Sequence, residues 1–412
     1  MAETLSACRA CRAPDPYLFL PLGDHPPANM FVRPEDADKP QPAFALNAQA
    51  CLNCGLIQVA DQIPEDFFRH YLYVPSAATT MHGHFDALAE RLVAEAGGGL
   101  IVDIGCNDGL LLMKCNDKGA KTLGIDPAAN LAETANERGV EVHVAYFGPQ
   151  TARDVLDRNG RASVIVTTNT FNHIGDLHDF MAGVDILLAE DGTFVIEVPR
   201  ADKLLEYNAF DTIYQEHVSE FSLLSIQKLA EFFDMTVGDV VKMDVHAGSM
   251  RVFVKRNGAK KTEAVTTLLA EEKAAGVLSA EAYDALAGRV QDIRAELLEM
   301  LEDAKAQGLK LAGYGAPAKG NTLLNFFGIG PDLLPFLVDR SPLKQGLLSP
   351  GMKIPVRSVE AVEEESVDVL LVLAWNFLDE IRAQQEGFLS RGGRLLAPLP
   401  TPRFIGSAPA ER

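Results

Sequence analysis

The chain has 412 residues, a length that suggests two or three domains, and its composition of 47% hydrophobic and 23% charged residues excludes a disordered protein. Lys and Arg number 37 against 57 Asp and Glu, a net charge of −20, which excludes nucleic acid and anionic membranes as main partners. No apolar run reaches the about 18 residues of a membrane span. The N-terminus MAETLSACRACRAP lacks the hydrophobic stretch of a secretory signal, so we expect a cytoplasmic protein.

The first segment, residues 1–70, is rich in proline and contains two C-x-x-C pairs, Cys8/Cys11 and Cys51/Cys54. A segment with so few apolar stretches is hard to stabilise by burial alone. Two such turns can supply the four thiolates of a tetrahedral zinc site. A redox pair would open a helix in a thioredoxin-like unit, and neither pair is followed by that pattern. The spacing therefore predicts a structural zinc with no open coordination position.

The second segment, residues 71–256, alternates apolar strands with helical stretches. The expected strands are 100–105, 120–126, 162–169 and 192–200, followed by an antiparallel hairpin within 236–256. Strand–helix alternation with short turns predicts a doubly wound parallel sheet that binds its ligand at the carboxyl ends of the strands.

The third segment, residues 257–412, begins with a predicted helical linker over 262–307 that ends at Gly308. Its apolar positions recur at helical spacing and predict one packed face, formed by Val290, Ile293, Leu297, Met300, Leu301 and Ala304. Four further apolar runs follow, namely LKLAGYG, LLPFLVDRS, VDVLLVLAWN and GGRLLAPLP. They predict a second Rossmann-like α/β unit.

The turn DIGCNDG, residues 103–109, carries the main chemical signal of the second segment. Gly105 lets the backbone approach a ligand closely, and Asp126 ends the next strand, where a carboxylate can accept from ribose hydroxyls. The spacing after Gly105 misses the G-x-G-x-x-G of a dinucleotide site. Asp103 suits a cofactor with ammonium and sulfonium charge, which favours S-adenosylmethionine (SAM) over NAD. Asn107 of the turn and Asn169, at the end of the third strand, complete the predicted cofactor site; a purely structural turn is the alternative.

Several motifs then occur in order: YLYVPSAATTMHGHF, NTFNHIGDLHDF, FDTIYQEHVSEFSL, HAGSMRVF and GYGAPAKGNTLLNFF. Together with the cysteine pairs and DIGCNDG, they resemble the deoxysugar C-methyltransferases of antibiotic and polysaccharide pathways. The resemblance extends from Cys8 to about Phe404. It implies an α/β protein with a small zinc-binding N-terminal domain, a class I SAM-methyltransferase Rossmann-like core and a second Rossmann-like domain for the sugar nucleotide.

The same resemblance implies methylation of a ring carbon in a nucleotide-linked 4-keto-6-deoxysugar, at C3, with C5 as an alternative. This chain departs from the family pattern in three places. The family's IYHEH reads IYQEH, with Gln215 in place of a histidine; Glu220 replaces an aromatic residue; and HGGS reads HAGS, with Ala247. These changes bear on the identity of the sugar more than on the reaction.

Carbon methylation next to a ketone needs a base to form the enolate and a donor or cation for its oxygen. Tyr214 and His217 are three apart and would share a face on a helical turn, and histidine has the intrinsic pKa of a base at neutral pH. Glu216 either orients an imidazole or serves another partner. The resemblance implies His217 as the base with Tyr214 near the enolate oxygen. It also matches Tyr73 to an active-site aromatic, with a packing role as the alternative.

His173, in NTFNHIGD, lies just past the third strand, on the ligand edge of the sheet. That position makes it either the second candidate for the base or a positioning residue. Cys106 and Cys115 stand outside the cysteine pairs. We read them as small buried hydrophobic residues rather than as nucleophiles.

The turn GYGAPAKGN, residues 313–321, follows a strand and opens a helix, so its backbone can cradle a diphosphate with Lys319 adding charge. Tyr314 and Asn321 of this turn, with His246 and Arg251 of the hairpin, complete the predicted substrate site. Residues 309–346 are locally basic, with Lys310, Lys319, Arg340 and Lys344 against Asp332 and Asp339.

The partner predicted for this site is therefore a small nucleotide sugar, and the sequence is compatible with a monomer or a dimer. Transfer of the methyl group to oxygen or nitrogen needs no enolate and stays open as an alternative. So does a relative that binds sugar nucleotides without catalysis.

Overall fold

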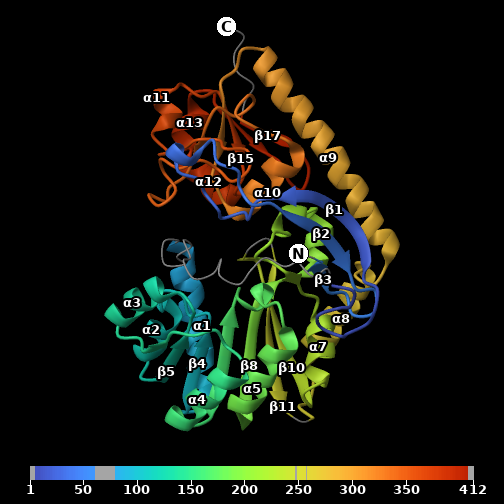
Figure 1. Cartoon of the computed structure of the whole chain (residues 1–412), viewed down its shortest axis with the longest axis vertical. Coiled ribbons are helices and arrows are strands. Elements are labelled where there is room, and N and C mark those ends of the chain that lie inside the picture. Colours follow the sequence, from blue (N-terminus) through green and yellow to red (C-terminus); the bar gives the residue numbers. More distant parts are fainter. Residues whose placement is uncertain (1–4, 61–78, 246–247, 257, 407–412) are drawn as a thin grey trace.

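The computed structural model describes residues 5–60, 79–245, 248–256 and 258–406, and within them the chain forms three sheets (Figure 1). The first sheet has the strand order β1–β2–β3–β9, with antiparallel neighbours: β1 (Tyr17–His25), β2 (Phe44–Ala50), β3 (Ile57–Val59) and β9 (Ser219–Glu220). A 3-10 turn (Pro34–Asp36) lies between β1 and β2. Since β9 comes from the middle of the chain, the N-terminal segment completes its sheet with a distant strand. The segment boundaries at residues 70 and 256 stay predictions.

The second sheet has the strand order β10–β11–β8–β7–β4–β5–β6, and β11 alone runs antiparallel to its neighbours. The strands are β4 (Leu100–Ile104), β5 (Lys121–Ile125), β6 (Val142–His143), β7 (Ala162–Thr168), β8 (Leu188–Pro199), β10 (Met235–Met243) and β11 (Ser249–Arg256). The predicted strands and the terminal antiparallel hairpin are confirmed. Because the strand order reverses between β4 and β7, the ligand crevice of such a sheet lies at the carboxyl ends of these strands.

Helices connect the strands of this sheet. They are α1 (Thr79–Ala96), α2 (Leu110–Asn116), α3 (Ala129–Glu137), α4 (Pro149–Asn159), α5 (Leu177–Leu187), α6 (Ala201–Tyr207) and α7 (Leu223–Glu231), with the 3-10 turns η4 (Phe171–His173) and η5 (Phe210–Thr212). Figure 1 shows α1–α5 and α7 packed around the central strands, whereas α6 contributes Ala201, Leu204 and Leu205 to the core that it shares with α9. A core of buried apolar side chains joins the sheet to α5 and α7 and also includes Cys8, Cys51 and Cys54. The cysteine end of the first segment is therefore packed against the middle of the molecule.

The linker forms two helices, α8 (Glu263–Ala274) and α9 (Ala280–Ala306), where the sequence predicted one. The break falls at Gly276, whose φ of 84° belongs to the left-handed region that ends helices. The predicted apolar face of α9 is confirmed, with Met300 partly buried and the other five residues buried. Figure 1 shows α9 running along one side of the molecule and linking its two halves. In the part of the chain that the structure describes, no helix combines the length and apolar character of a membrane span.

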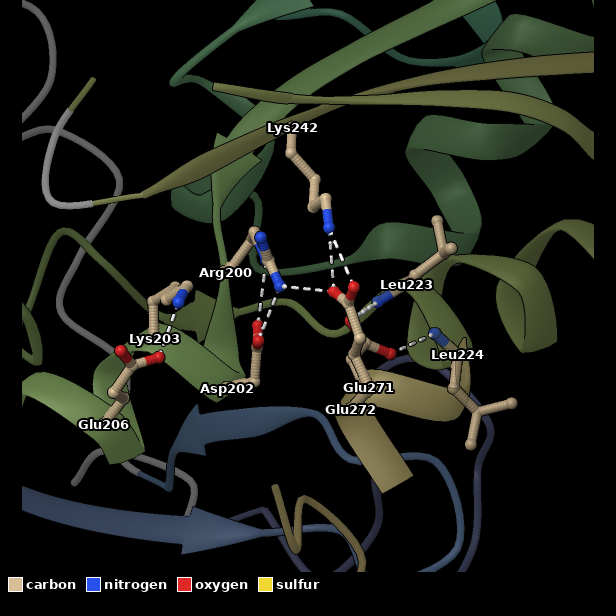
Figure 2. Close-up of polar contacts among 9 residues, drawn as sticks. All are labelled: Arg200, Asp202, Lys203, Glu206, Leu223, Leu224, Lys242, Glu271 and Glu272. Carbon is tan, nitrogen blue, oxygen red and sulfur yellow. Dashed lines mark hydrogen bonds and ion pairs between the residues drawn. The ribbon is translucent and has the colours of Figure 1, made fainter. Parts of the chain in front are cut away.

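A polar junction joins α7 and α8 to the second sheet (Figure 2). The buried Glu272 carboxylate accepts from the N–H groups of Leu223 and Leu224, at 2.6 and 3.3 Å, and so caps the first turn of α7. Next to it, Glu271 accepts from Lys242 at 2.8 Å and lies 3.6 Å from Arg200. The two hydrogen bonds to Glu272 satisfy N–H groups at the start of α7 that have no partner within the helix, which fixes where α7 begins.

The third sheet has the order β14–β13–β12–β15–β16–β17, parallel except for β17. Its strands are β12 (Leu311–Tyr314), β13 (Leu337–Val338), β14 (Val356–Arg357), β15 (Val369–Val372), β16 (Arg394–Ala397) and β17 (Arg403–Ile405). Its helices are α10 (Ala318–Phe327), α11 (Ala361–Glu364), α12 (Leu378–Gln384) and α13 (Glu386–Ser390), with a 3-10 turn η7 (Trp375–Phe377). This is the predicted second Rossmann-like unit, and its own reversal of strand order lies between β12 and β15.

Candidate active site

The four paired cysteines converge, with all four sulfur atoms within 4.8 Å of one another. Cys8 Sγ lies 3.6 Å from Cys54 Sγ, and Cys11 Sγ lies 3.5 Å from Cys51 Sγ. Zn–S bonds of about 2.3 Å place tetrahedral sulfurs slightly under 4 Å apart, so this donor set fits zinc. The crowded thiols also hydrogen bond to one another, which lowers the pKa of Cys11 to about 6.

The residue between Cys8 and Cys11 ties this cluster to the middle of the chain. The Nη1 atom of Arg9 donates to Val59 O at 2.7 Å and to Val218 O at 2.8 Å. On the other side, Ser222 Oγ donates to Cys54 O at 2.8 Å. The cysteine cluster is therefore held against the chain segment on either side of β9.

The turn after β4 leaves no room for a side chain at Gly105. Its φ is 78°, and a Cβ atom there would lie 2.2 Å from Thr170 Oγ1. Gly109, with a φ of 75°, precedes α2, and its Cβ would lie 2.9 Å from the Cβ of Ala135. The backbone of this turn therefore lies close to the residue that follows Asn169, as a glycine-dependent cofactor cradle requires.

Three predicted cofactor residues lie at the carboxyl ends of neighbouring strands: Asp103 in β4, Asp126 after β5 and Asn169 after β7. The Asp126 carboxylate accepts from the N–H groups of Asn107, at 2.9 Å, and Ala128, at 2.8 Å, which fastens the glycine turn to the second strand. Burial raises the pKa of Asp126.

The surroundings of the Asp103 carboxyl group favour the binding of a cation. It is buried, and its Oδ1 has no hydrogen-bond partner. Burial, with the nearby charges of Asp126 and Glu197, raises its pKa to about 8. The ammonium group of SAM would supply the missing donor and the opposite charge, so the residues present fit this cofactor.

The aromatic and imidazole rings of the predicted catalytic segment lie together. His217 stacks on Tyr214 with ring centroids 4.1 Å apart, and the ring of His173 lies 5.1 Å from that of His217. The spacing predicts a helical turn for Tyr214 and His217. The structure instead brings them together in a non-helical turn after η5. Burial lowers the pKa of His217 to about 3 and that of His173 well below its ordinary value, so both rings are neutral at neutral pH.

The carboxyl group next to His217 belongs to Glu220. Its Oε1 lies 3.0 Å from His217 Nδ1. Glu216 serves another partner, the second of its two predicted alternatives: its Oε2 accepts from Asn29 Nδ2 at 2.5 Å. Burial raises the pKa of Glu216 to about 7. The sequence pattern marks Glu220 as a departure from the family and does not predict this contact.

Gln215 binds the last residue of β1, and the predicted substrate residue Asn321 binds the loop that follows it. Gln215 Nε2 donates to His25 O at 3.1 Å, and Asn321 Nδ2 donates to Ala28 O at 2.8 Å. The proline-rich loop HPPANM therefore joins the catalytic segment to α10. No sequence signal beyond its prolines pointed to this role.

Lys319 lies at the start of α10 with its Nζ 4.2 Å from the centroid of the Trp375 ring. Trp375 Nε1 in turn donates to Asp211 Oδ2 at 2.8 Å, and Asp211 is fully buried. Burial lowers the pKa of Lys319 to about 8, and its charge also lowers the pKa of His217. This charge therefore acts on the catalytic segment as well as on the second glycine turn.

Other predicted substrate residues have partners of their own. The Tyr314 hydroxyl donates to Gln384 Oε1 at 3.3 Å. Arg251 pairs with Glu197, whose Oε2 accepts from its guanidinium at 2.7 and 2.9 Å, while His84 Nε2 lies 2.6 Å from Glu197 Oε1. Tyr73 and His246 lie outside the described residues.

The predicted basic patch is smaller than its sequence range. Lys310 precedes β12 and Asp332 precedes β13, so both lie at the amino edge of the third sheet, where Lys310 Nζ donates to Glu365 O. Lys344, by contrast, donates to Ala316 O in the glycine turn at 2.8 Å. Each strand runs from one edge of the sheet to the other, so residues that are close in sequence can lie at opposite edges. The sequence range therefore does not separate Lys310 from Lys344.

Comparisons with known proteins agree with this organisation. Residues 8–68 match a family described as "Putative zinc binding domain", residues 78–238 one described as "Methyltransferase domain", and residues 244–400 one described as "C-methyltransferase C-terminal domain". The C-methyltransferase NovU of Streptomyces niveus is 37% identical over 413 residues, covering 99% of this chain and 98% of the relative. A ubiquinone biosynthesis O-methyltransferase of Methylobacterium sp. (strain 4-46) is 29% identical over 123 residues, covering 30% of this chain and 48% of the relative.

Among solved structures, the magnesium protoporphyrin IX methyltransferase ChlM of Synechocystis PCC 6803 with bound SAM is 13% identical with a TM-score of 0.33, covering 43% of this chain and 80% of that chain. The CcbJ methyltransferase of Streptomyces caelestis is 11% identical with a TM-score of 0.35, covering 47% and 96%. The family assignment rests on the full-length relative and on the family matches. The predicted class I methyltransferase core, SAM as cofactor and the zinc-binding segment are thereby confirmed, and the chain belongs to the C-methyltransferase family.

Proposed function

We propose that the chain methylates C3 of a nucleotide-linked 4-keto-6-deoxysugar through an enolate. The proposal rests on one observation above all: His217 stacks on Tyr214 and lies 5.1 Å from His173, just past β7 at the cofactor edge. A half-buried, neutral imidazole beside a phenol is the pair that enolate formation needs, a proton acceptor and a hydrogen-bond donor.

In this mechanism SAM supplies an electrophilic methyl group. His217 accepts the proton from the carbon next to the ketone, and the electrons of that C–H bond move to the carbonyl oxygen. Tyr214 donates a hydrogen bond to that oxygen as its charge develops. The positive charge of Lys319, which already acts on His217, favours the anionic enolate. His173 positions the reacting ring of the sugar.

The second glycine turn supports a nucleotide as the handle of the substrate. After β13, the Asp339 carboxylate accepts from the N–H groups of Ala316, at 2.7 Å, and Ser341, at 2.8 Å. Asp126 makes the same pair of bonds in the cofactor unit, to the glycine turn and to the residue two positions on. Lys344 lies 3.9 Å from Asp339 and adds charge for a diphosphate.

The test is deuterium exchange from solvent into the carbon beside the ketone, without SAM, over a panel of nucleotide 4-keto-6-deoxysugars. His217→Asn keeps a polar side chain but cannot accept the proton as imidazole does, so exchange should fall at least about 100-fold. Tyr214→Phe should cost less, and Gln215→His should be tolerated.

His173→Asn tests the alternative assignment of the base. Exchange that persists in His217→Asn and disappears in His173→Asn would make His173 the base. A methylated product without exchange would indicate transfer to oxygen or nitrogen. Neither exchange nor product from any keto sugar would indicate a binding protein.

A further inference from the structure

We propose that Glu220 is the positioning residue of His217 and determines which of its two ring nitrogens accepts the substrate proton. The inference rests on the proposed function, in which His217 is the base. It begins with one contact, the 3.0 Å separation of Glu220 Oε1 and His217 Nδ1. A histidine presents one nitrogen to its orienting partner and the other to its substrate, so with Glu220 at Nδ1 the proposal assigns Nε2 to the reacting carbon. The backbone of Thr212 also hydrogen-bonds the ring and opposes the fall of its pKa, so Nε2 must exchange any such bond for the substrate.

The backbone holds Glu220 in place. Glu220 lies in β9, where it pairs with Ile57 of β3, and Ser219 pairs with Gln58. Val59 N–H donates to Val218 O at 3.0 Å, which extends this pairing to the residue after His217. The side chain of Glu220 is 3% exposed and that of His217 is 16% exposed. A carboxyl group fixed by a strand and shielded from water can hold an imidazole in one orientation.

The proton that Glu220 carries decides the tautomer of the ring. Burial raises the pKa of Glu220 well above its ordinary value and lowers that of His217 to about 3. In the resting pair the carboxylic acid therefore donates to Nδ1, and Nε2 bears the ring hydrogen and cannot act as a base. When the pair loses one proton, the carboxylate accepts from Nδ1–H and the lone pair of Nε2 becomes available.

The pair of His217 and Glu220 can then take up the substrate proton without another group. The substrate C–H bond breaks, its electrons move to the carbonyl oxygen, and its proton binds Nε2 while Nδ1–H stays hydrogen-bonded to the carboxylate. Among the described residues, the groups that act on His217 are the Tyr214 and His173 rings beside it, the backbone of Thr212, and the charge of Lys319 from α10. Burial shifts the pKa of Glu220. The low pKa of His217 opposes formation of the imidazolium. The neighbouring Glu220 carboxylate stabilises that cation.

The first experiment reads the tautomer directly, without substrate. Full-length zinc-bound protein labelled with ¹⁵N-histidine has nine histidines, and His217→Asn identifies the signals of His217. In the wild type we expect a hydrogen on Nε2 at pH 6 that moves to Nδ1 as the pH rises. In Glu220→Gln the tautomer should be independent of pH. A wild-type tautomer that does not change with pH, or changes equally in the variant, overturns the proposal.

The second experiment measures deuterium exchange into a keto sugar between pH 6 and 9. Glu220→Gln should lower the rate by about 10²- to 10⁴-fold, leave the substrate Kd within about twofold and remove the rise of rate with pH that the pair causes. Glu220→Asp keeps the carboxyl group and should restore part of the rate. The matched control is Glu272→Gln, another buried carboxyl, which should keep the wild-type pH profile.

The two experiments separate two failures. If the wild type exchanges no keto sugar, the proposed function is wrong, and the NMR titration still decides the role of Glu220. If the wild type exchanges and folded Glu220→Gln exchanges at the same rate with the same profile, Glu220 does not position the base.

Discussion

SAM affinity should depend on pH through Asp103. Its buried carboxyl has a pKa raised to about 8, so at neutral pH the free protein holds it protonated. A SAM ammonium needs the ionised form. At pH 6.5, ionising a group of pKa about 8 costs roughly 1.4 kcal/mol per pH unit, or about 2 kcal/mol, equivalent to an affinity about 30-fold weaker than for the ionised site.

Calorimetric titrations between pH 6 and 7.5 test this, since the α-amino group of SAM stays largely protonated in that range. The Kd for SAM should fall about tenfold for each unit by which the pH rises, and the protein should release about one proton when SAM binds. Methylthioadenosine, which shares the adenosine but lacks the ammonium-bearing chain, is the matched ligand and should show no such slope. Asp103→Asn should abolish the slope for SAM and weaken binding at pH 8 by about 10- to 100-fold.

A SAM affinity that is constant over this range, or an equal slope for methylthioadenosine, would refute the placement of the ammonium at Asp103. The sign is fixed by the direction of the shift. A raised carboxyl pKa means that lower pH protonates the site and opposes a cation, whereas an unshifted carboxyl would be ionised throughout and give no slope.

Three further predictions concern the zinc site and the cofactor turn. Cys51→Ser should lower zinc content and melting temperature together; a metal-free variant as stable as the wild type would contradict a structural zinc. Asp126→Ala should weaken SAM binding about 10- to 100-fold by calorimetry, and an unchanged Kd would contradict a ribose contact. Gly105→Ala should abolish measurable SAM binding, because its Cβ meets Thr170 at 2.2 Å; Gly98→Ala, with a φ of 89° and nothing within 4 Å, is the control for backbone strain alone and should bind normally.

The sequence predicts the parts of the fold whose signals are local. Strands β4, β5, β7 and β8 are apolar runs that end in short polar turns, so their periodicity survives in any tertiary context. The turn after β4 and each C-x-x-C turn are equally local, because each spans only a few residues. The meeting of the two cysteine pairs joins residues 40 and 46 positions apart, and its prediction rests on the four ligands that a zinc ion needs rather than on a local signal.

The rest of the site depends on contacts that sequence spacing does not encode. Strand β9 has two residues and pairs with β3, about 160 positions earlier, so no period marks it. Trp375 meets Asp211 across 164 residues, and Asn29 meets Glu216 across 187. Such contacts follow from how two Rossmann-like units and a proline-rich loop pack together, and chain order does not specify that packing.

These long-range contacts connect the zinc segment to the segment that carries the proposed base. Arg9 lies between two zinc ligands, is 6% exposed, and donates from one nitrogen to Val59 O and Val218 O. Val218 follows His217 directly. The guanidinium of Arg9 thus joins the cysteine cluster to the β3–β9 pairing and to the backbone next to His217, the proposed base. Each hydrogen bond to a charged donor is worth about 1.5–3 kcal/mol.

Arg9→Met should therefore separate metal binding from catalysis. It preserves all four thiols and most of the side-chain volume, so zinc content should stay near wild type, while two buried carbonyls lose their donor. We expect a lower melting temperature and a fall of at least about tenfold in exchange rate, with substrate Kd changed less. Arg12→Met, at an exposed arginine of the same turn whose guanidinium lies over the Phe232 ring, is the matched control and should keep the exchange rate. A folded, zinc-replete Arg9→Met that exchanges at the wild-type rate would show that the zinc segment stabilises the fold without positioning His217.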